Sequence, residues 1–152
     1  MNLTEISEKE FFQEIENIFH VHMKPKQMHD QIVNHMKTDQ GLKAMIPKLK
    51  ADKVALFSNS LGSIAMEVLK KRHLTGKKFF DRIFISTKMH MAKPDKEAYQ
   101  YVLKQLKVKP AEAMMVDDRI ENLLPARRLG MQGILYKNSR QFGRELKKYE
   151  LV

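Results

Sequence analysis

Short apolar runs alternate with amphipathic segments from residue 54 to the end of the chain. The runs have the length of buried strands and lie at residues 54–57, 83–85, 114–116 and 133–136. The segments between them carry apolar residues at helical spacing. Strands that alternate with helices in this way form a parallel sheet, because each helix returns the chain across a face of the sheet. The sequence therefore predicts an α/β fold with helices on both faces of a parallel sheet.

The first part of the chain has helical periodicity. An apolar stripe predicts a helix over residues 5–23, and Ser7 with Glu10 has the spacing of a capping box. Pro25 interrupts this pattern, and a second helix is expected over residues 27–38, followed by a short one after residue 42. Residues 86–92 are expected to form a loop, and residues 139–149 are expected to form the last helix.

Four of the six histidines lie in this helical part, at positions 20, 22, 29 and 35. No acidic or cysteine residue accompanies them at a convincing ligand spacing, so the sequence predicts surface histidines rather than a metal site.

The net charge of +10 arises entirely after residue 50. An anionic partner is therefore worth considering, and a basic module that binds nucleic acid or another polyanion is the alternative function. The basic residues occur in scattered pairs, which is typical of solvated helix faces, so nucleic acid is an unlikely partner. Cysteine is absent, which excludes disulfides and thiolate chemistry. Without a long apolar run or a signal-peptide pattern, a cytoplasmic protein with no membrane partner is expected.

Two adjacent carboxylates follow the apolar run 114–116. Asp117 and Asp118 repel each other, and burying either without a partner is costly. A strand that ends in this way usually directs its carboxylates at a hard cation such as Mg²⁺. The alternative is that they cap the following helix, since Asp is a favoured N-cap residue.

Polar residues stand at two further strand or loop ends. Ser58 and Asn59 follow the first apolar run, and Lys93 precedes a helix that Pro94 and Asp95 open. A parallel sheet brings such ends to one edge, where a hydroxyl, an ammonium group and a bound cation suit a phosphate dianion. Taken alone, Ser58 could be an ordinary turn residue and Lys93 an exposed lysine before a helix.

This order of motifs resembles the haloacid dehalogenase (HAD) superfamily. Ser58-Asn59, Lys93-Pro94 and Asp117-Asp118 with Asn122 are similar to its phosphatase-like branch, as is the run Ala126–Leu135. The resemblance covers essentially the whole chain. It implies a small helical cap at residues 1–45 and a Rossmann-like core at residues 46–152.

The resemblance also implies roles for these residues. Ser58 is the hydroxyl that binds the transferring phosphoryl group, with Asn59 beside it, and Lys93 stabilises the charge of nucleophile and phosphate. Asp117 and Asp118 hold Mg²⁺, while Asn122 stands where many members carry a further acid. Ala92 replaces a glycine that is common before the lysine. The implied activity is a Mg²⁺-dependent phosphatase acting on a small phosphorylated molecule.

The family's first motif is Asp-x-Asp, which supplies the covalent nucleophile at the end of the first core strand. In this sequence no two aspartates are separated by a single residue; they stand at positions 30, 39, 52, 81, 95, 117 and 118. Phosphoryl transfer through an aspartyl-phosphate needs that carboxylate. We therefore expect a chain without the first core strand that is inactive or nearly so, either a fragment or a degenerate member. Mg²⁺ binding should be weak. In the family's sheet the first strand lies between the strand that ends at Ser58 and the one that ends at Asp117, so its absence interrupts the sheet and should favour a homodimer or a sheet completed in trans.

Overall fold

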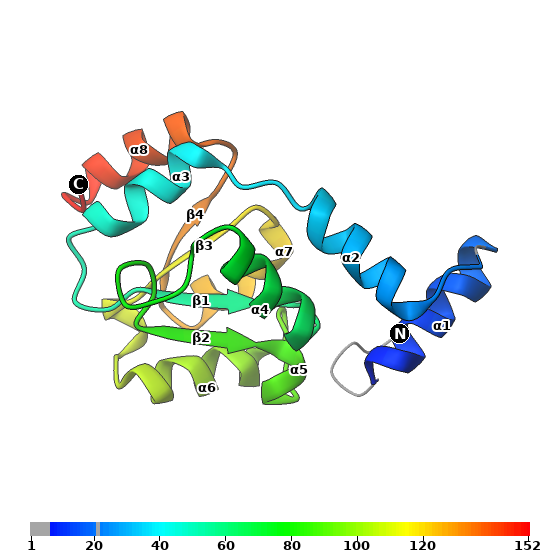
Figure 1. Ribbon diagram of the computed structural model, residues 1–152. Helices are drawn as coiled ribbons and strands as arrows, with labels where there is room; N and C mark the ends of the chain where they lie inside the picture. Colours follow the sequence, from blue (N-terminus) through cyan, green and yellow to red (C-terminus); the bar gives the residue numbers. More distant parts are fainter. Residues whose placement is uncertain (1–6, 21) are drawn as a thin grey trace.

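The computed structural model describes residues 7–20 and 22–152 and has an α/β architecture (Figure 1). Strands and helices alternate from residue 55 onward, as the apolar pattern predicts. The elements in chain order are α1 (Glu8–Phe19), α2 (Pro25–His35), α3 (Gln40–Met45), η1 (Ile46–Lys48), β1 (Ala55–Ser58), α4 (Gly62–Lys71), β2 (Arg82–Ile85), α5 (Ser86–Met89), α6 (Lys96–Leu106), η2 (Pro110–Glu112), β3 (Met114–Asp117), α7 (Ile120–Arg128), β4 (Gln132–Leu135) and α8 (Ser139–Lys148).

All the strand pairing in the described residues is parallel. Strand β1 pairs with β2 so that Ser58 lies opposite Ile85, and β3 pairs with β4 so that Asp117 lies opposite Leu135. Each polar strand end therefore lies at the carboxyl edge of its own pair. The predicted α/β class with parallel strands is confirmed.

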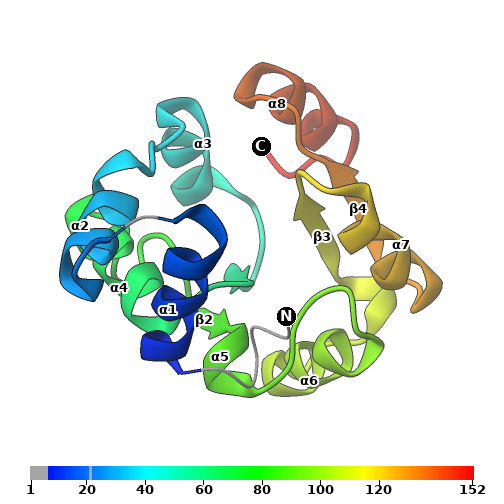
Figure 2. The same cartoon turned by 90° about the vertical axis from the view of Figure 1, so that its right-hand side faces the viewer.

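The two strand pairs remain separate. In the part of the chain that the structure describes, β1 is not hydrogen-bonded to β3, and each pair forms its own two-stranded sheet. Figure 2 shows β2 on one side and β3 with β4 on the other, with α6 crossing below them. The interruption that the sequence predicts in the middle of the sheet is thus not removed by direct pairing of the flanking strands.

Side chains connect the two pairs where backbone hydrogen bonds do not. Tyr99 on α6 is 1% exposed and packs with Met115, Leu123 and Ala126 in one cluster. Phe57 of β1 packs against this cluster, and its ring centroid lies 5.5 Å from that of Tyr99 in an edge-to-face arrangement. Helix α6 therefore holds β1 and β3 at a fixed separation.

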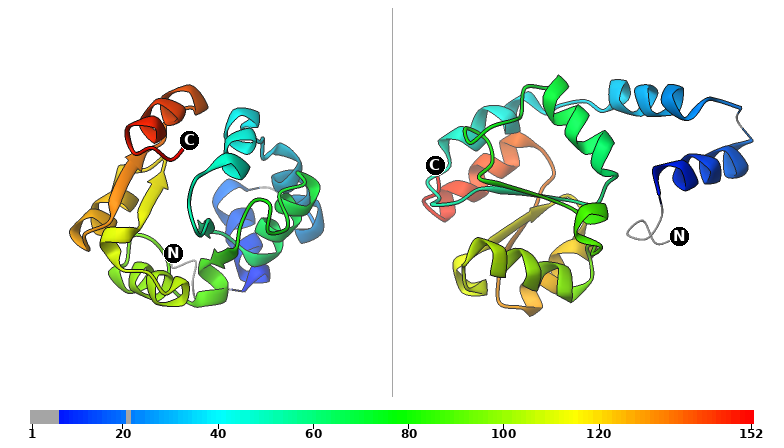
Figure 3. Two further views of the ribbon diagram at one scale, coloured as in Figure 1. Left: turned by 90° about the vertical axis from the view of Figure 1, so that its left-hand side faces the viewer. Right: turned by 60° about the horizontal axis from the view of Figure 1, so that its bottom comes forward.

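Helices α1 and α2 project from the body of the molecule (Figure 3). Their apolar face packs on α4 through a buried cluster that includes Phe12, Met28, Val33, Leu61 and Ile64. Helix α3, in contrast, packs against α8. The proposed division into a cap at residues 1–45 and a core at residues 46–152 stays a prediction.

The capping box predicted for the first helix is present. The Ser7 hydroxyl accepts a hydrogen bond from the Glu10 amide at 3.2 Å, and the Glu10 carboxylate accepts one from the Ser7 amide at 2.7 Å. The helix ends where His20 adopts a left-handed conformation with φ of 51°. Residues 5, 6 and 21 of the expected helix lie outside the described residues.

One local prediction is wrong. Residues 86–92 were expected to form a loop, but Ser86–Met89 form the one-turn helix α5. Ser86 is fully buried and its hydroxyl accepts a hydrogen bond from the Ser60 amide at 3.1 Å, which anchors the turn to the end of β1. Among the described helices, none has the length and hydropathy to cross a bilayer.

Candidate phosphate and metal site

The ammonium group of Lys93 lies between the ends of β1 and β3. Its Nζ donates to Asp117 Oδ2 at 2.7 Å and to the carbonyl oxygen of Phe57 at 2.8 Å. The side chains of Lys93 and Asp117 are only 8% and 6% exposed, so this ion pair is nearly buried. Since Phe57 belongs to β1 and Asp117 to β3, one cation bridges the interruption of the sheet.

Asn59 fixes the backbone around Lys93. Its Nδ2 donates to the Lys93 carbonyl at 2.7 Å, and its Oδ1 accepts from the Lys93 amide at 2.9 Å. The Lys93 ammonium also lies 5.0 Å from the centroid of the Phe57 ring, a cation–π distance. The Ser58 hydroxyl lies 3.0 Å from that of Ser60. The structure thus places the loops that carry Ser58, Asn59 and Lys93 side by side.

Asp117 is held as an anion. Its Oδ1 accepts hydrogen bonds from the Arg119 amide and from Asn122 Nδ2, both at 2.9 Å. Burial alone raises the pKa of this carboxyl, but the hydrogen bonds from Lys93, Asn122 and Arg119 together with the Lys93 charge outweigh burial and lower its pKa below 3.8. Asp117 is therefore ionised at neutral pH.

A buried tyrosine supports Asn122. Tyr99 Oη donates to the Asn122 carbonyl at 2.6 Å, and burial followed by the charges of Asp117 and Asp95 raises the pKa of its phenol. Asn122 itself is buried. Tyr99 thus holds the helix turn from which Asn122 reaches Asp117.

Asp118 differs from Asp117 because its side chain is exposed. Neither aspartate is the N-cap of α7: that position is Arg119, which makes no side-chain capping hydrogen bond. The structure therefore does not match the alternative that the two carboxylates cap this helix. Asp117 instead accepts from an amide two residues ahead while it binds Lys93.

Asp117 and Asp118 are the residues that could hold Mg²⁺ here. Mg²⁺ is usually bound by one or two carboxylates, several waters and substrate oxygens. Asp118 is accessible, but Asp117 Oδ2 already accepts a hydrogen bond from a cation at 2.7 Å and Oδ1 accepts two. The donor set therefore has the right chemistry for Mg²⁺, with Lys93 competing for one of its two carboxylates.

Two contributors were missed by reasoning from the sequence. The carbonyl of Phe57 binds Lys93 and the hydroxyl of Tyr99 binds Asn122. In the sequence both residues look like ordinary apolar core positions. Every residue has a backbone carbonyl, and the sequence does not show which group a tyrosine on an apolar helix face will bind.

The prediction of a surface histidine is wrong for His29. Its side chain is only 13% exposed, and its Nδ1 lies 3.6 Å from Asp30 Oδ1 and 3.7 Å from Glu67 Oε2. The missing acidic partner, Glu67, belongs to α4 and approaches only when α2 packs on that helix. Spacing along the sequence could not have identified it.

Comparisons with known proteins show the family of the chain. The family model described as haloacid dehalogenase-like hydrolase matches residues 1–136. A sesquiterpene phosphatase from Aspergillus oryzae is 32% identical over 105 residues, which are 68% of this chain and 53% of that protein. Bifunctional epoxide hydrolase 2 from Rattus norvegicus is 42% identical over 69 residues, which are 45% of this chain and 12% of that protein. The chain thus spans about half, or less, of these curated relatives.

Solved structures share the fold. A predicted HAD-like family hydrolase from Porphyromonas gingivalis superposes with a TM-score of 0.76 at 21% identity, covering 98% of this chain and 76% of that one. A HAD family enzyme from Bacteroides thetaiotaomicron, in complex with magnesium and inorganic phosphate, gives a TM-score of 0.74 at 22% identity, covering 90% and 72%. With the family model matching most of its length, the chain belongs to the haloacid dehalogenase-like hydrolases.

Proposed function

We propose that residues 1–152 form the phosphate- and metal-binding part of a Mg²⁺-dependent phosphomonoester phosphatase, and that they do not turn over substrate by themselves. The observation that carries this proposal is the position of the Lys93 ammonium, at the carboxyl ends of β1 and β3 and beside Asp117. A buried cation at a strand edge is a suitable group for a phosphoryl oxygen.

In this proposal the Ser58 hydroxyl and the Lys93 ammonium bind the phosphate of a small phosphorylated molecule, and Asn59 positions Lys93. Asp118 with Asp117 holds Mg²⁺, which when bound would neutralise phosphate charge, and Asn122 orients Asp117. Support comes from the hydrogen bonds of Asn59 and Asn122 and from the structural neighbour that was crystallised with magnesium and phosphate. Residues 1–45 are proposed as the cap that selects the substrate.

The proposed inactivity follows from the missing nucleophile. Asp-x-Asp is absent from the sequence, and the carboxylate nearest to Lys93, Asp117, already accepts three hydrogen bonds. A carboxylate whose oxygens already accept three hydrogen bonds is not free to attack a phosphoryl group. Removing a nucleophile from an enzyme of this kind costs several orders of magnitude in rate.

We further propose that the interrupted sheet is completed in trans, through a homodimer or a strand from another chain. Strands β1 and β3 each have a neighbour on one side only among the described residues. Each backbone group left buried and unpaired costs about 1–3 kcal/mol, whereas a domain has only about 5–15 kcal/mol of stability in total. Light scattering over a dilution series should show a dimer; a well-folded monomer at micromolar concentration contradicts this part of the proposal.

Titration with inorganic phosphate, followed by NMR of the backbone amides, tests the binding function. At physiological ionic strength, amides around residues 58–60 and 93 should shift, and Ser58→Ala should weaken binding. Ser63→Ala is the matched control, because Ser63 is an exposed serine on the neighbouring helix α4. Affinity that Ser58→Ala and Lys93→Met both leave unchanged would assign phosphate to the basic surface and refute the proposed site.

A further inference from the structure

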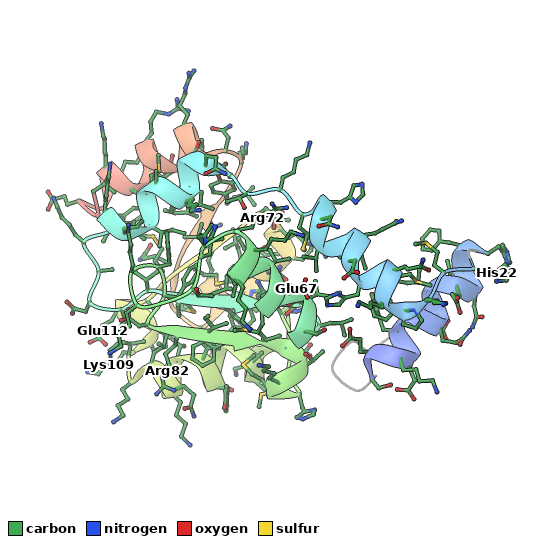
Figure 4. All side chains as sticks on the ribbon, viewed as in Figure 1. His22, Glu67, Arg72, Arg82, Lys109 and Glu112 are labelled. Carbon is green, nitrogen blue, oxygen red and sulfur yellow. The ribbon has the colours of Figure 1, made fainter. Side chains whose placement is uncertain are left out.

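A second cluster of metal-ligating side chains lies away from Lys93, where α2 packs on α4. His29 and Asp30 are on α2, and Glu67 is on α4. One ligand atom from each of the three lies within 4.8 Å of the others. In Figure 4, Glu67 lies on the side of α4 that faces α2.

The separations match those of ligands that share one metal ion. Tetrahedral zinc with bonds of about 2.0–2.2 Å holds its ligand atoms about 3.3–3.6 Å apart. His29 Nδ1 lies 3.6 Å from Asp30 Oδ1 and 3.7 Å from Glu67 Oε2. Both distances are longer than hydrogen bonds, so His29 Nδ1 lies near each carboxylate without a direct hydrogen bond to it.

The three side chains line a surface hollow, and the two helices that carry them are held together. They line a hollow between α1, α2 and α4 together with Glu8, Lys9 and Lys26. The His29 side chain is only 13% exposed, whereas the side chains of Asp30 and Glu67 are about half exposed and can adjust. At the far end of the same helix pair, Arg72 Nη2 donates to the carbonyls of Asn34 at 3.1 Å and Met36 at 2.8 Å, which fixes α2 against α4.

We propose that His29, Asp30 and Glu67 bind a zinc-class transition-metal ion that fastens α2 to α4. One imidazole nitrogen with two carboxylates is a borderline donor set that favours Zn²⁺ or Co²⁺ over Mg²⁺, which prefers oxygen alone. Three protein ligands leave the fourth position to water. The site is separate from Asp117 and Asp118 and does not depend on phosphatase activity.

The test is Zn²⁺ and Co²⁺ binding to tag-free protein, followed by calorimetry and by the visible absorption of Co²⁺. The wild type should bind one ion, and Zn²⁺ should raise its melting temperature. His29→Ala and Glu67→Gln should each weaken binding by more than about tenfold, since even loss of an outer-shell partner costs 10–100-fold. Glu67→Gln keeps the shape of an exposed side chain, so its effect is not explained by misfolding.

Matched controls separate this site from the rest of the chain. His35 is an exposed histidine on the same helix, bonded to the Gln31 carbonyl, and His35→Ala should leave Zn²⁺ binding unchanged. Asp118→Asn should also leave it unchanged. Wild-type protein that binds no Zn²⁺, or His29→Ala and Glu67→Gln variants that bind as well as the wild type, would show that the cluster is an ion pair only and overturn the proposal.

Discussion

Replacement of Lys93 by methionine removes the charge that neutralises Asp117 while it keeps most of the side-chain volume. Lys93 and Asp117 are 2.7 Å apart and nearly buried, so the substitution leaves an anion without its cation. Removing one partner of a buried ion pair lowers the free energy of unfolding by about 3–5 kcal/mol. Asn122 and the Arg119 amide still bind the carboxylate, so we expect the lower end, about 3 kcal/mol.

Urea unfolding at pH 7 measures this loss. With a slope of about 1.5 kcal/mol/M, the midpoint of Lys93→Met should fall by about 2 M. The matched control is Lys96→Met, an exposed lysine at the start of α6, which should stay within about 0.5 kcal/mol of the wild type.

The difference in unfolding free energy between the wild type and Lys93→Met should depend on pH. The pKa of Asp117 is lowered in the folded protein, so its contribution to stability is complete above its ordinary pKa of 3.8 and is lost as pH falls through the lower folded value. The gap between wild type and Lys93→Met should therefore be widest above about pH 5 and shrink in acid. A loss under about 1 kcal/mol at pH 7, or a gap that does not change with pH, would refute the claim that this pair is a stabilising element.

Three further predictions follow from the site and the surface. Tyr99→Phe removes the donor to the Asn122 carbonyl and should cost about 1–2 kcal/mol in urea unfolding; an unchanged midpoint would show that water replaces the hydroxyl. Mg²⁺ should bind weakly and Asp118→Asn should abolish that binding in calorimetry or NMR, whereas tight binding would mean that another carboxylate completes the site. Affinity for DNA or RNA should be weak and fall steeply with salt, and a sequence-preferring complex at physiological salt would favour the alternative of a nucleic-acid module.

The proximity of Lys93 to Asn59 and Asp117 could be expected from the sequence. Residues that end parallel strands share one edge, so this expectation needs no knowledge of packing. The interruption between β1 and β3 was predicted from the family resemblance, because the family's first strand lies between these two strands.

Contacts that arise only from tertiary packing escaped prediction. The bond of Lys93 to the Phe57 carbonyl depends on how far the loop before α6 reaches, and Glu67 meets His29 only because α2 lies on α4. Residues 86–89 carry no apolar periodicity, and their helix depends on the burial of Ser86 against Ser60. Local patterns contain no information on these contacts.

The rate at which the purified chain hydrolyses a generic phosphate monoester in the presence of Mg²⁺ tests the central claim most directly. It is compared with that of a Ser58→Ala, Asp118→Asn double variant, which removes a phosphate donor and a metal ligand but keeps the buried pair of Lys93 and Asp117. Because residues 1–152 contain no Asp-x-Asp, both proteins should hydrolyse the ester at the same background rate. Turnover by the wild type that the double variant abolishes would contradict the claim and show that another residue of this chain serves as the nucleophile.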